Sequence, residues 1–217
     1  MEFGRQNNNC YVMDEGFTLW KIIRKENELP VFRGENGNHI FVHILVLSGE
    51  LKAEWEGIQY PLTKNSFADF IDGRSLEIRD ISEDIQAYVL FFTAPFIASL
   101  MKNTAPFPPS YILHTKAWPV SVLSSEVTER IQKRMSYIVE SLKDESHHFY
   151  TEMMSCTLQI YMMDIANEFI QQENEGGAKM EVSRKHILFK QFVGLLLAHI
   201  LLPLHPETSL NELVNGC

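Results

Sequence analysis

The hydrophobic pattern of this chain changes its period once, near Trp118, and that change limits the possible folds more than any other feature. Before Trp118, short apolar runs are either continuous or alternate with polar residues. After it, apolar residues recur every three or four positions. The first pattern is typical of strands and the second of amphipathic helices. Strands followed by helices, rather than alternating with them, predict a segregated α+β fold.

The first hundred residues predict an antiparallel barrel or sandwich. Residues 40–47 form a nearly unbroken apolar run, which is typical of a strand buried on both faces. Residues 51–55 and 58–62 alternate on either side of Glu56-Gly57, so we expect a tight hairpin in which Gly57 adopts a positive φ. Further strands are expected at 17–23, 66–71, 76–81 and 85–93.

The second part of the chain predicts a connector and then helices. A short helix is expected from Pro95 to about Lys102, and the prolines that follow favour irregular structure. The expected division is a β domain at 1–105, a Pro-rich connector at 106–120, and a helical module with an irregular tail at 121–217. Its helices are expected to begin after Ser124 or Ser125, near Phe149 and at Ser183. The stripe of the first is Val127, Ile131, Met135, Ile138 and Leu142, and that of the second is Tyr150, Met154, Leu158, Tyr161, Ile165 and Phe169.

The net charge of the chain bears on which partners it binds, and its cysteines bear on the cellular compartment in which it works. A net charge of −9, from 19 Lys and Arg against 28 Asp and Glu, is spread over both halves, so direct nucleic-acid binding by this chain is not expected. The three cysteines lie far apart, which predicts free thiols in the cytoplasm, with Cys156 packed in an apolar helix face. The longest apolar stretch, at 192–204, is shorter than the roughly 20 residues of a membrane span.

The sequence carries no convincing catalytic or metal motif. His39 and His43 lie four residues apart on an expected strand, which separates them by about 13 Å, too far to share an ion. Neither a nucleophile elbow nor a phosphate-binding loop occurs. We therefore expect no catalytic residue, no metal and no cofactor.

The helices are apolar over more than one face. Methionine doublets at 153–154 and 162–163 widen the second helix beyond a single stripe, and residues 189–202 are similarly apolar. Such helices either cover one another within one molecule or leave a face for a second subunit. We favour a homodimer through the C-terminal helices, because only three helices are available to shield one another.

Residues 41–51, the Glu56-Gly57 hairpin and residues 60–67 together resemble a cupin half-barrel. Followed by amphipathic helices, this order resembles the N-terminal sensing and dimerisation region of AraC-type transcription regulators. Residues 184–199 are similar to the helix that leads into the DNA-binding domain of many Bacteroidetes members. The resemblance implies a jelly-roll barrel, or double-stranded β-helix. It also implies two helix-turn-helix units beyond the barrel, for which the sequence after residue 200 offers at most a helix fragment at 209–214.

The chain departs from metal-binding cupins at both of their ligand motifs. Asn36, Asn38 and Val42 occupy the neighbourhood of the first ligand set, and Ala68, Asp69 and Phe70 stand where the second-motif histidine is expected. Metal-dependent catalysis is therefore not expected.

The resemblance implies a non-catalytic sensor that binds a small-molecule effector inside the barrel. By alternation, Phe41, His43, Trp55 and Tyr60 face the interior and line the ligand site, or else they form the barrel core. Two other functions stay open. One is an interaction protein that forms mixed dimers with full-length regulators, and the other is a cupin enzyme with metal ligands from elsewhere.

Overall fold

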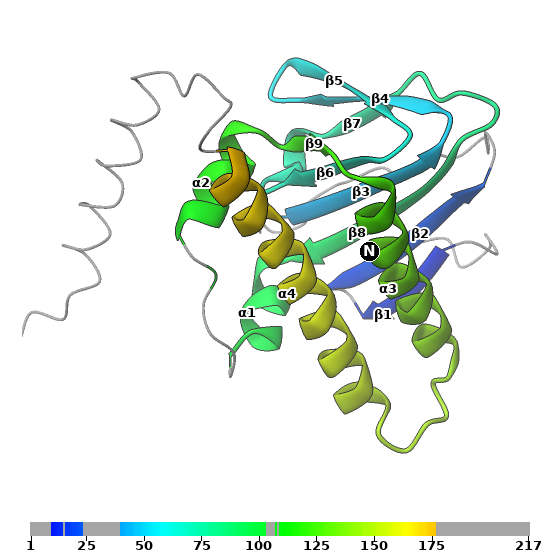
Figure 1. The fold of residues 1–217 in the computed structure, drawn as a ribbon. Helices are drawn as coiled ribbons and strands as arrows, with labels where there is room; N and C mark the ends of the chain where they lie inside the picture. Colours follow the sequence, from blue (N-terminus) through cyan, green and yellow to red (C-terminus); the bar gives the residue numbers. More distant parts are fainter. Residues whose placement is uncertain (1–9, 15, 24–39, 103–106, 108, 177–217) are drawn as a thin grey trace, which may run out of the picture. The chain divides into compact units, whose positions relative to one another are not determined.

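Strands fill the first half of the fold and helices the second (Figure 1). The computed structural model describes residues 10–14, 16–23, 40–102, 107 and 109–176. The strands are β1 Cys10–Asp14, β2 Phe17–Ile23, β3 Ile40–Ser48, β4 Glu50–Trp55, β5 Ile58–Thr63, β6 Ser66–Phe70, β7 Glu77–Arg79, β8 Gln86–Thr93 and β9 Val120–Val122. The helices are α1 Ala94–Leu100, α2 Pro109–Ala117, α3 Ser125–Lys143 and α4 Tyr150–Gly176.

The strands form two antiparallel sheets with an apolar core between them. The larger has the order β1-β2-β8-β3-β6-β9 and the smaller the order β5-β4-β7. Buried side chains from both sheets, among them Val42, Ile44 and Phe70 from the larger and Leu51 and Leu62 from the smaller, meet in one cluster. This cluster is the interior of the β domain.

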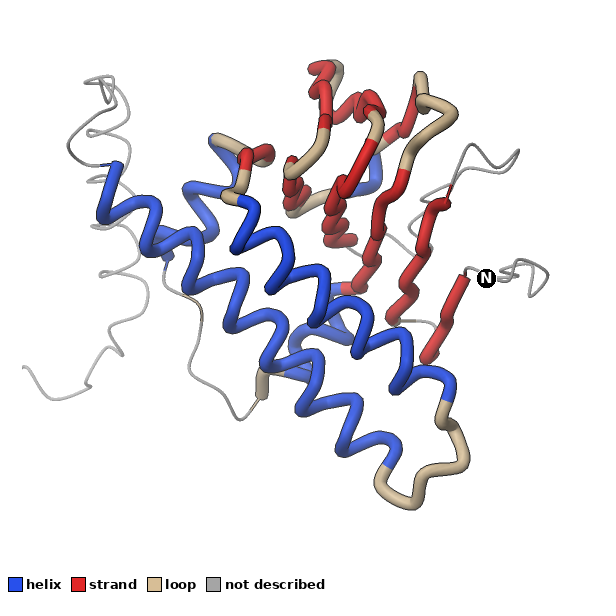
Figure 2. The backbone as a smooth tube through the Cα atoms, turned by 45° about the vertical axis from the view of Figure 1, so that its right-hand side comes forward, coloured by secondary structure: helices blue, strands red, loops and turns tan. Residues whose placement is uncertain are grey.

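A second core lies on the opposite face of the larger sheet, beneath the helices. Strand β3 shows the division, since Val42, Ile44 and Val46 belong to the interior cluster whereas Leu45 packs against the helices. Figure 2 shows the helices gathered on one side of the strands. Because successive strand residues point to opposite faces, a central strand covered on both sides is apolar throughout. Coverage of β3 by the smaller sheet on one face and by the helices on the other explains why residues 40–47 form a nearly unbroken apolar run.

The hairpin between β4 and β5 confirms the turn prediction. Glu56 has a φ of 52° and Gly57 a φ of 77°. Positive φ at both central residues is the type I′ geometry, which matches the right-handed twist of the flanking strands. The β4–β5 register pairs Trp55 with Ile58 across this turn.

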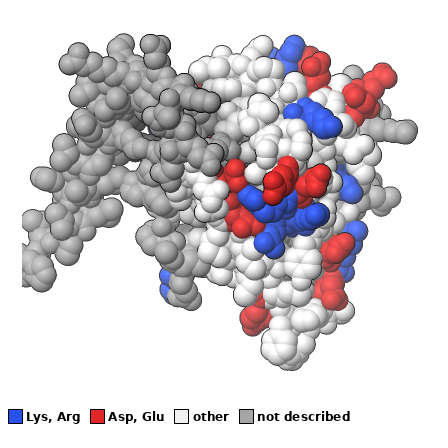
Figure 3. Space-filling model, in the orientation of Figure 1, with Lys and Arg blue, Asp and Glu red and all other residues white. Residues whose placement is uncertain are grey.

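Helices α3 and α4 form where the sequence predicts them, and they run side by side. The Ser124 hydroxyl accepts a hydrogen bond from the Val127 N–H at 3.2 Å and caps α3. Both predicted stripes face the core beneath the helices. Ion pairs of Arg130 with Glu168 and of Arg134 with Asp164 join the outer edges of the two helices. Acidic and basic side chains lie intermixed on the face shown in Figure 3.

The prediction of irregular structure over 106–120 is wrong for the part that forms α2. This helix begins at Pro109, where the missing N–H of proline is no loss, because the first-turn N–H groups of a helix have no intrahelical partner. Strand β9 follows and pairs with β6 at the edge of the larger sheet. Strand β1 was not predicted either. The helix expected from Ser183 lies outside the described residues.

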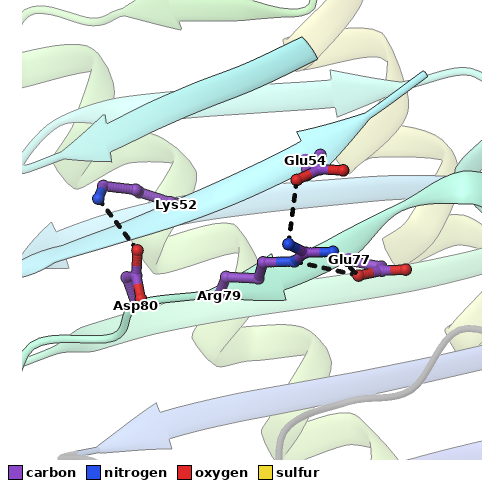
Figure 4. A network of polar contacts seen from close by, with 5 residues as sticks. All are labelled: Lys52, Glu54, Glu77, Arg79 and Asp80. Atoms are coloured by element: carbon purple, nitrogen blue, oxygen red, sulfur yellow. Dashed lines mark hydrogen bonds and ion pairs between the residues drawn. The ribbon is translucent and has the colours of Figure 1, made fainter. Parts of the chain in front are cut away.

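The outer face of the smaller sheet carries exposed ion pairs. Arg79 on β7 contacts Glu54 and Glu77, and Lys52 pairs with Asp80 (Figure 4). Exposed pairs of this kind contribute about 0–1 kcal/mol each, so they mark the solvent face rather than hold the sheets together. Among the described residues, no helix has the length and apolarity needed to cross a bilayer.

Candidate functional site

The structure brings together two of the four predicted ligand-site residues. Trp55 on β4 and Tyr60 on β5 lie diagonally across the hairpin, with ring centroids 6.5 Å apart, and both contact the ring of Phe70. The Trp55 indole N–H donates to the carbonyl oxygen of Asp72 at 2.6 Å. Both residues belong to the interior of the β domain, as predicted.

The other two, Phe41 and His43, lie on the opposite face of the larger sheet. The prediction that they face the interior is wrong, because both side chains of β3 at these positions point toward the helices. They share a face with each other, as the alternation requires. Alternation sorts residues into two sets but does not say which set points inward when both faces are covered.

His43 belongs to a buried polar cluster, which we define as His43, Asp69, Tyr111 and Tyr161. Its Nδ1 lies 2.8 Å from the Tyr161 hydroxyl on α4, and its Nε2 lies 3.4 Å from Asp69 Oδ1 on β6. The Tyr111 hydroxyl on α2 donates to Asp69 Oδ2 at 2.6 Å. With a proton on Nε2 of His43, Nδ1 accepts from Tyr161 and every ring nitrogen faces a partner.

The cluster is closed off from solvent. His43 is 1% exposed, Asp69 3% and Tyr161 0%. The rings of Phe67 and Phe92 lie edge-on to His43, with centroids 5.5 and 5.2 Å away. A buried carboxylate is tolerated when it is hydrogen-bonded, and here the larger sheet places the Nε2 of His43 beside Oδ1 of Asp69 while helix α2 supplies the Tyr111 hydroxyl as a donor to Oδ2.

Both tyrosines of the cluster stay protonated over the physiological range. Burial and then the negative charge of Asp69 raise the pKa of Tyr111 well above its ordinary value of 10.0, and its hydrogen bond to Asp69 adds to this. The same two causes, in the same order, raise the pKa of Tyr161. Both hydroxyls therefore keep the proton that they donate.

The buried polar cluster joins the larger sheet to helices α2 and α4. Two strands of the larger sheet and two helices each contribute one residue, so neither helix can shift without changing a buried hydrogen bond. The Thr115 hydroxyl donates to the Tyr111 carbonyl oxygen at 2.9 Å within α2. Among the described residues, no group of three or more His, Cys, Asp and Glu side chains is placed to hold a metal ion.

Sequence reasoning found His43 but not its partners. Asp69 is the one charged residue in the apolar strand at 66–70, and a charge in an otherwise buried run is the signal that points to a paired site. Tyr161 appears only as a member of the helix stripe. Tyr111 falls in the segment expected to be irregular.

Comparisons with known proteins identify similar folds in solved structures. No family model and no curated protein matches the sequence. Apo ToxT from Vibrio cholerae strain SCE256 is 16% identical, with a TM-score of 0.40, over 77% of this chain and 55% of that chain. ToxT from Vibrio cholerae O395 bound to (E)-4-(8-methylnaphthalen-1-yl)but-3-enoic acid is 10% identical, with a TM-score of 0.39, over 74% and 58%.

A cupin domain is also among the similar structures. It is the Cupin_2 domain of an XRE family transcriptional regulator from Enterobacter cloacae, 22% identical with a TM-score of 0.28 over 35% of this chain and 79% of that domain. The predicted segregated α+β class, with an antiparallel two-sheet β domain ahead of the long helices, is confirmed. Because these TM-scores are below 0.5, the function of the chain is inferred from its own residues.

Proposed function

We propose that this chain is a non-catalytic sensing and dimerisation domain of an AraC-type transcription regulator. The observation that carries the proposal is the buried polar cluster, which ties helices α2 and α4 to the central strands of a cupin-like sheet. A ligand that moves the helices relative to the larger sheet would alter the hydrogen bonds of Asp69 and His43 and so the free energy of burying them. Ligand binding is thereby coupled to the position of the helices.

Dimerisation is proposed for the outer face of α4. Met153, Cys156, Ile160 and Met163 recur every three or four residues and so form one stripe. Ile160 and Met163 are 41% and 48% exposed, and Cys156 is exposed rather than packed as the sequence suggested. A second copy of the chain presents the same apolar stripe, which makes a self-complementary two-fold contact possible.

The effector site is proposed outside the β-domain interior. The interior between the two sheets is filled by apolar side chains that are at most 8% exposed. Trp55 belongs to this packed core and the partly buried Tyr60 packs against it, so opening a site there requires repacking of aromatic rings. This observation favours a ligand position beside the helices.

Light scattering coupled to size-exclusion chromatography tests the dimer. We expect twice the monomer mass of 25.1 kDa for the unmodified chain and the monomer mass for Ile160→Glu/Met163→Glu. Tyr137→Glu, which places the same charge at an exposed apolar position of α3, is the matched control and should remain dimeric. A monomeric unmodified chain contradicts the dimerisation proposal.

A reporter assay tests the regulatory part. The chain is fused to a DNA-binding module that represses transcription only as a dimer, and repression is compared with the Ile160→Glu/Met163→Glu fusion. We expect repression by the first fusion only. Equal reporter output from both fusions, at equal protein levels, contradicts a regulatory role that acts through this face.

The two alternatives predict different measurements. A mixed-dimer protein should retrieve an AraC-type paralogue in a pull-down, and a clean monomer would count against it as well. A cupin enzyme should retain near-stoichiometric iron, manganese, nickel or zinc after purification, measured by plasma mass spectrometry.

A further inference from the structure

A groove of about 620 Å³ lies between helix α1, the N-terminal half of α4 and the β1–β2 turn. Volumes of about 300–1,000 Å³ are typical of small-molecule sites. Apolar side chains of Met13, Phe96, Leu100 and Leu158 line it, and Leu158 is fully buried. The groove is therefore large enough for a ligand and has an apolar surface to offer it.

The polar groups of the groove are hydroxyls. Ser99 on α1 and Thr151 and Ser155 on α4 contribute them. The Thr93 hydroxyl accepts from the Phe96 N–H at 3.4 Å and so already caps α1. Among the described side chains that line the groove, none is ionisable. A charged ligand would lose hydration there without gaining a counter-charge, whereas hydroxyl or carbonyl groups would find partners.

The walls of the groove are held in place by contacts outside it. The Gln159 side-chain N–H donates to the carbonyl oxygen of Leu100 at 2.6 Å and joins the end of α1 to α4. The Phe96 ring stacks on Phe17 of β2, with centroids 5.7 Å apart. A site whose walls are already fixed loses little entropy on binding.

The groove and the buried polar cluster are in physical contact by two routes. Leu158 lies three residues before Tyr161 on α4, so the two side chains are neighbours on the same helix face. The second route is a series of rings: Phe17 contacts Phe92 at 5.2 Å, and Phe92 contacts His43 at 5.2 Å. A ligand that displaces Leu158 therefore acts directly beside Tyr161, and one that displaces Phe96 acts on His43 through the rings of Phe17 and Phe92.

We propose that this groove is the effector site and that it binds an uncharged, mainly apolar molecule carrying hydroxyl or carbonyl groups. The inference rests on the proposed sensing function and names its ligand class. Occupancy changes the position of α4 relative to β3 and is transmitted through the Tyr161–His43 hydrogen bond.

The test uses two probes of equal chain length and different charge, 1-octanol and octanoate. At pH 8 octanoate is fully ionised, since carboxyl pKa values lie near 4. Binding to the full chain is measured by isothermal titration calorimetry. We expect 1-octanol to bind at least tenfold more tightly than octanoate. Equal affinities, or no binding of 1-octanol, would overturn the proposal.

Groove-filling variants locate the binding. Ser155→Trp should abolish the 1-octanol signal, and Thr63→Trp, at an exposed position on β5 of the smaller sheet, should leave it unchanged. Ser99→Trp fills the groove from its exposed rim and serves if Ser155→Trp does not fold. Unchanged binding by a folded groove variant would also overturn the proposal.

The outcomes separate this inference from the proposed function. Normal dimerisation and repression without 1-octanol binding would exclude the groove and leave the regulatory role standing. Selective 1-octanol binding by a chain that neither dimerises nor represses would exclude that role and leave the groove as a ligand site.

Discussion

The Tyr161 hydroxyl on α4 lies 2.8 Å from Nδ1 of His43 on β3, although 118 residues separate them in the chain. Both side chains are buried, and Asp69 approaches the far side of the imidazole. This hydrogen bond, next to a buried charge, constrains the position of α4 relative to the central sheet in addition to the apolar core that the helix shares with that sheet. Hydrogen bonds in such surroundings are costly to leave unmade.

Tyr161→Phe should destabilise the fold. The substitution keeps the ring and removes the hydroxyl, so Nδ1 of His43 loses its partner while buried. We expect the free energy of unfolding to fall by about 1–3 kcal/mol, measured by urea denaturation. Tyr137→Phe on α3, where the side chain is 52% exposed, should change it by less than about 0.5 kcal/mol. Similar losses for the two variants would contradict the assignment.

Asp69→Asn should be more costly than any exposed carboxylate substitution. Asp69 accepts from Tyr111 and lies beside His43 in a buried site, and disrupting buried hydrogen bonds of this kind costs about 1–3 kcal/mol each. Asp80→Asn removes one partner of the exposed Lys52–Asp80 pair and should cost about 0–1 kcal/mol. Thermal or urea unfolding of the two variants provides the comparison, and equal stability would show that Asp69 is not an organising charge.

High pH should unfold the chain through the tyrosines of the cluster. Folding raises the pKa of Tyr111 and of Tyr161 above 10.0, so the unfolded chain releases these protons first as the pH rises. Their contribution to stability is complete below about pH 9 and is lost progressively above about pH 10. Urea denaturation from pH 8 to pH 11 should show this fall.

The double variant Tyr111→Phe/Tyr161→Phe is the control for the pH series. It starts from a lower stability because it lacks both hydrogen bonds, but its free energy of unfolding should fall less steeply between pH 9 and pH 11. If the two curves stay parallel over that range, other groups are responsible for the pH dependence.

Gly49 and Gly57 should respond differently to alanine. Both have positive φ, 70° and 77°, a conformation that costs a residue with a Cβ about 1–2 kcal/mol. A Cβ on Gly57 would meet no atom within 4 Å, whereas one on Gly49 would lie 2.8 Å from the Ile85 Cα. Gly57→Ala should therefore lower the free energy of unfolding only by the cost of a positive φ. Gly49→Ala should lower it clearly more, because the new Cβ also meets the Ile85 backbone. Equal urea midpoints would contradict the close approach of the Ile85 backbone to Gly49.

Local patterns along the chain were sufficient to predict most elements. Strands β2 to β8, the Glu56-Gly57 turn and helices α1, α3 and α4 follow from periodicity, turn residues and capping residues that act within a few positions. The predicted stripes of α3 and α4 are the residues that face the core. Helix α2 was missed because a proline at a first turn looks the same in sequence as a proline in a loop.

The orientation of β3 and the partners of its histidine came only from the three-dimensional arrangement. With Ile40 to Leu47 apolar on both faces, periodicity separates Phe41 and His43 from Val42 and Ile44 without saying which pair meets the second sheet. That choice depends on which face the helices cover, and Asp69, Tyr111 and Tyr161 reach His43 only after strands and helices distant in sequence have packed. Contacts of this range depend on how whole layers meet, because a residue's neighbours in the chain constrain its conformation but not its distant partners.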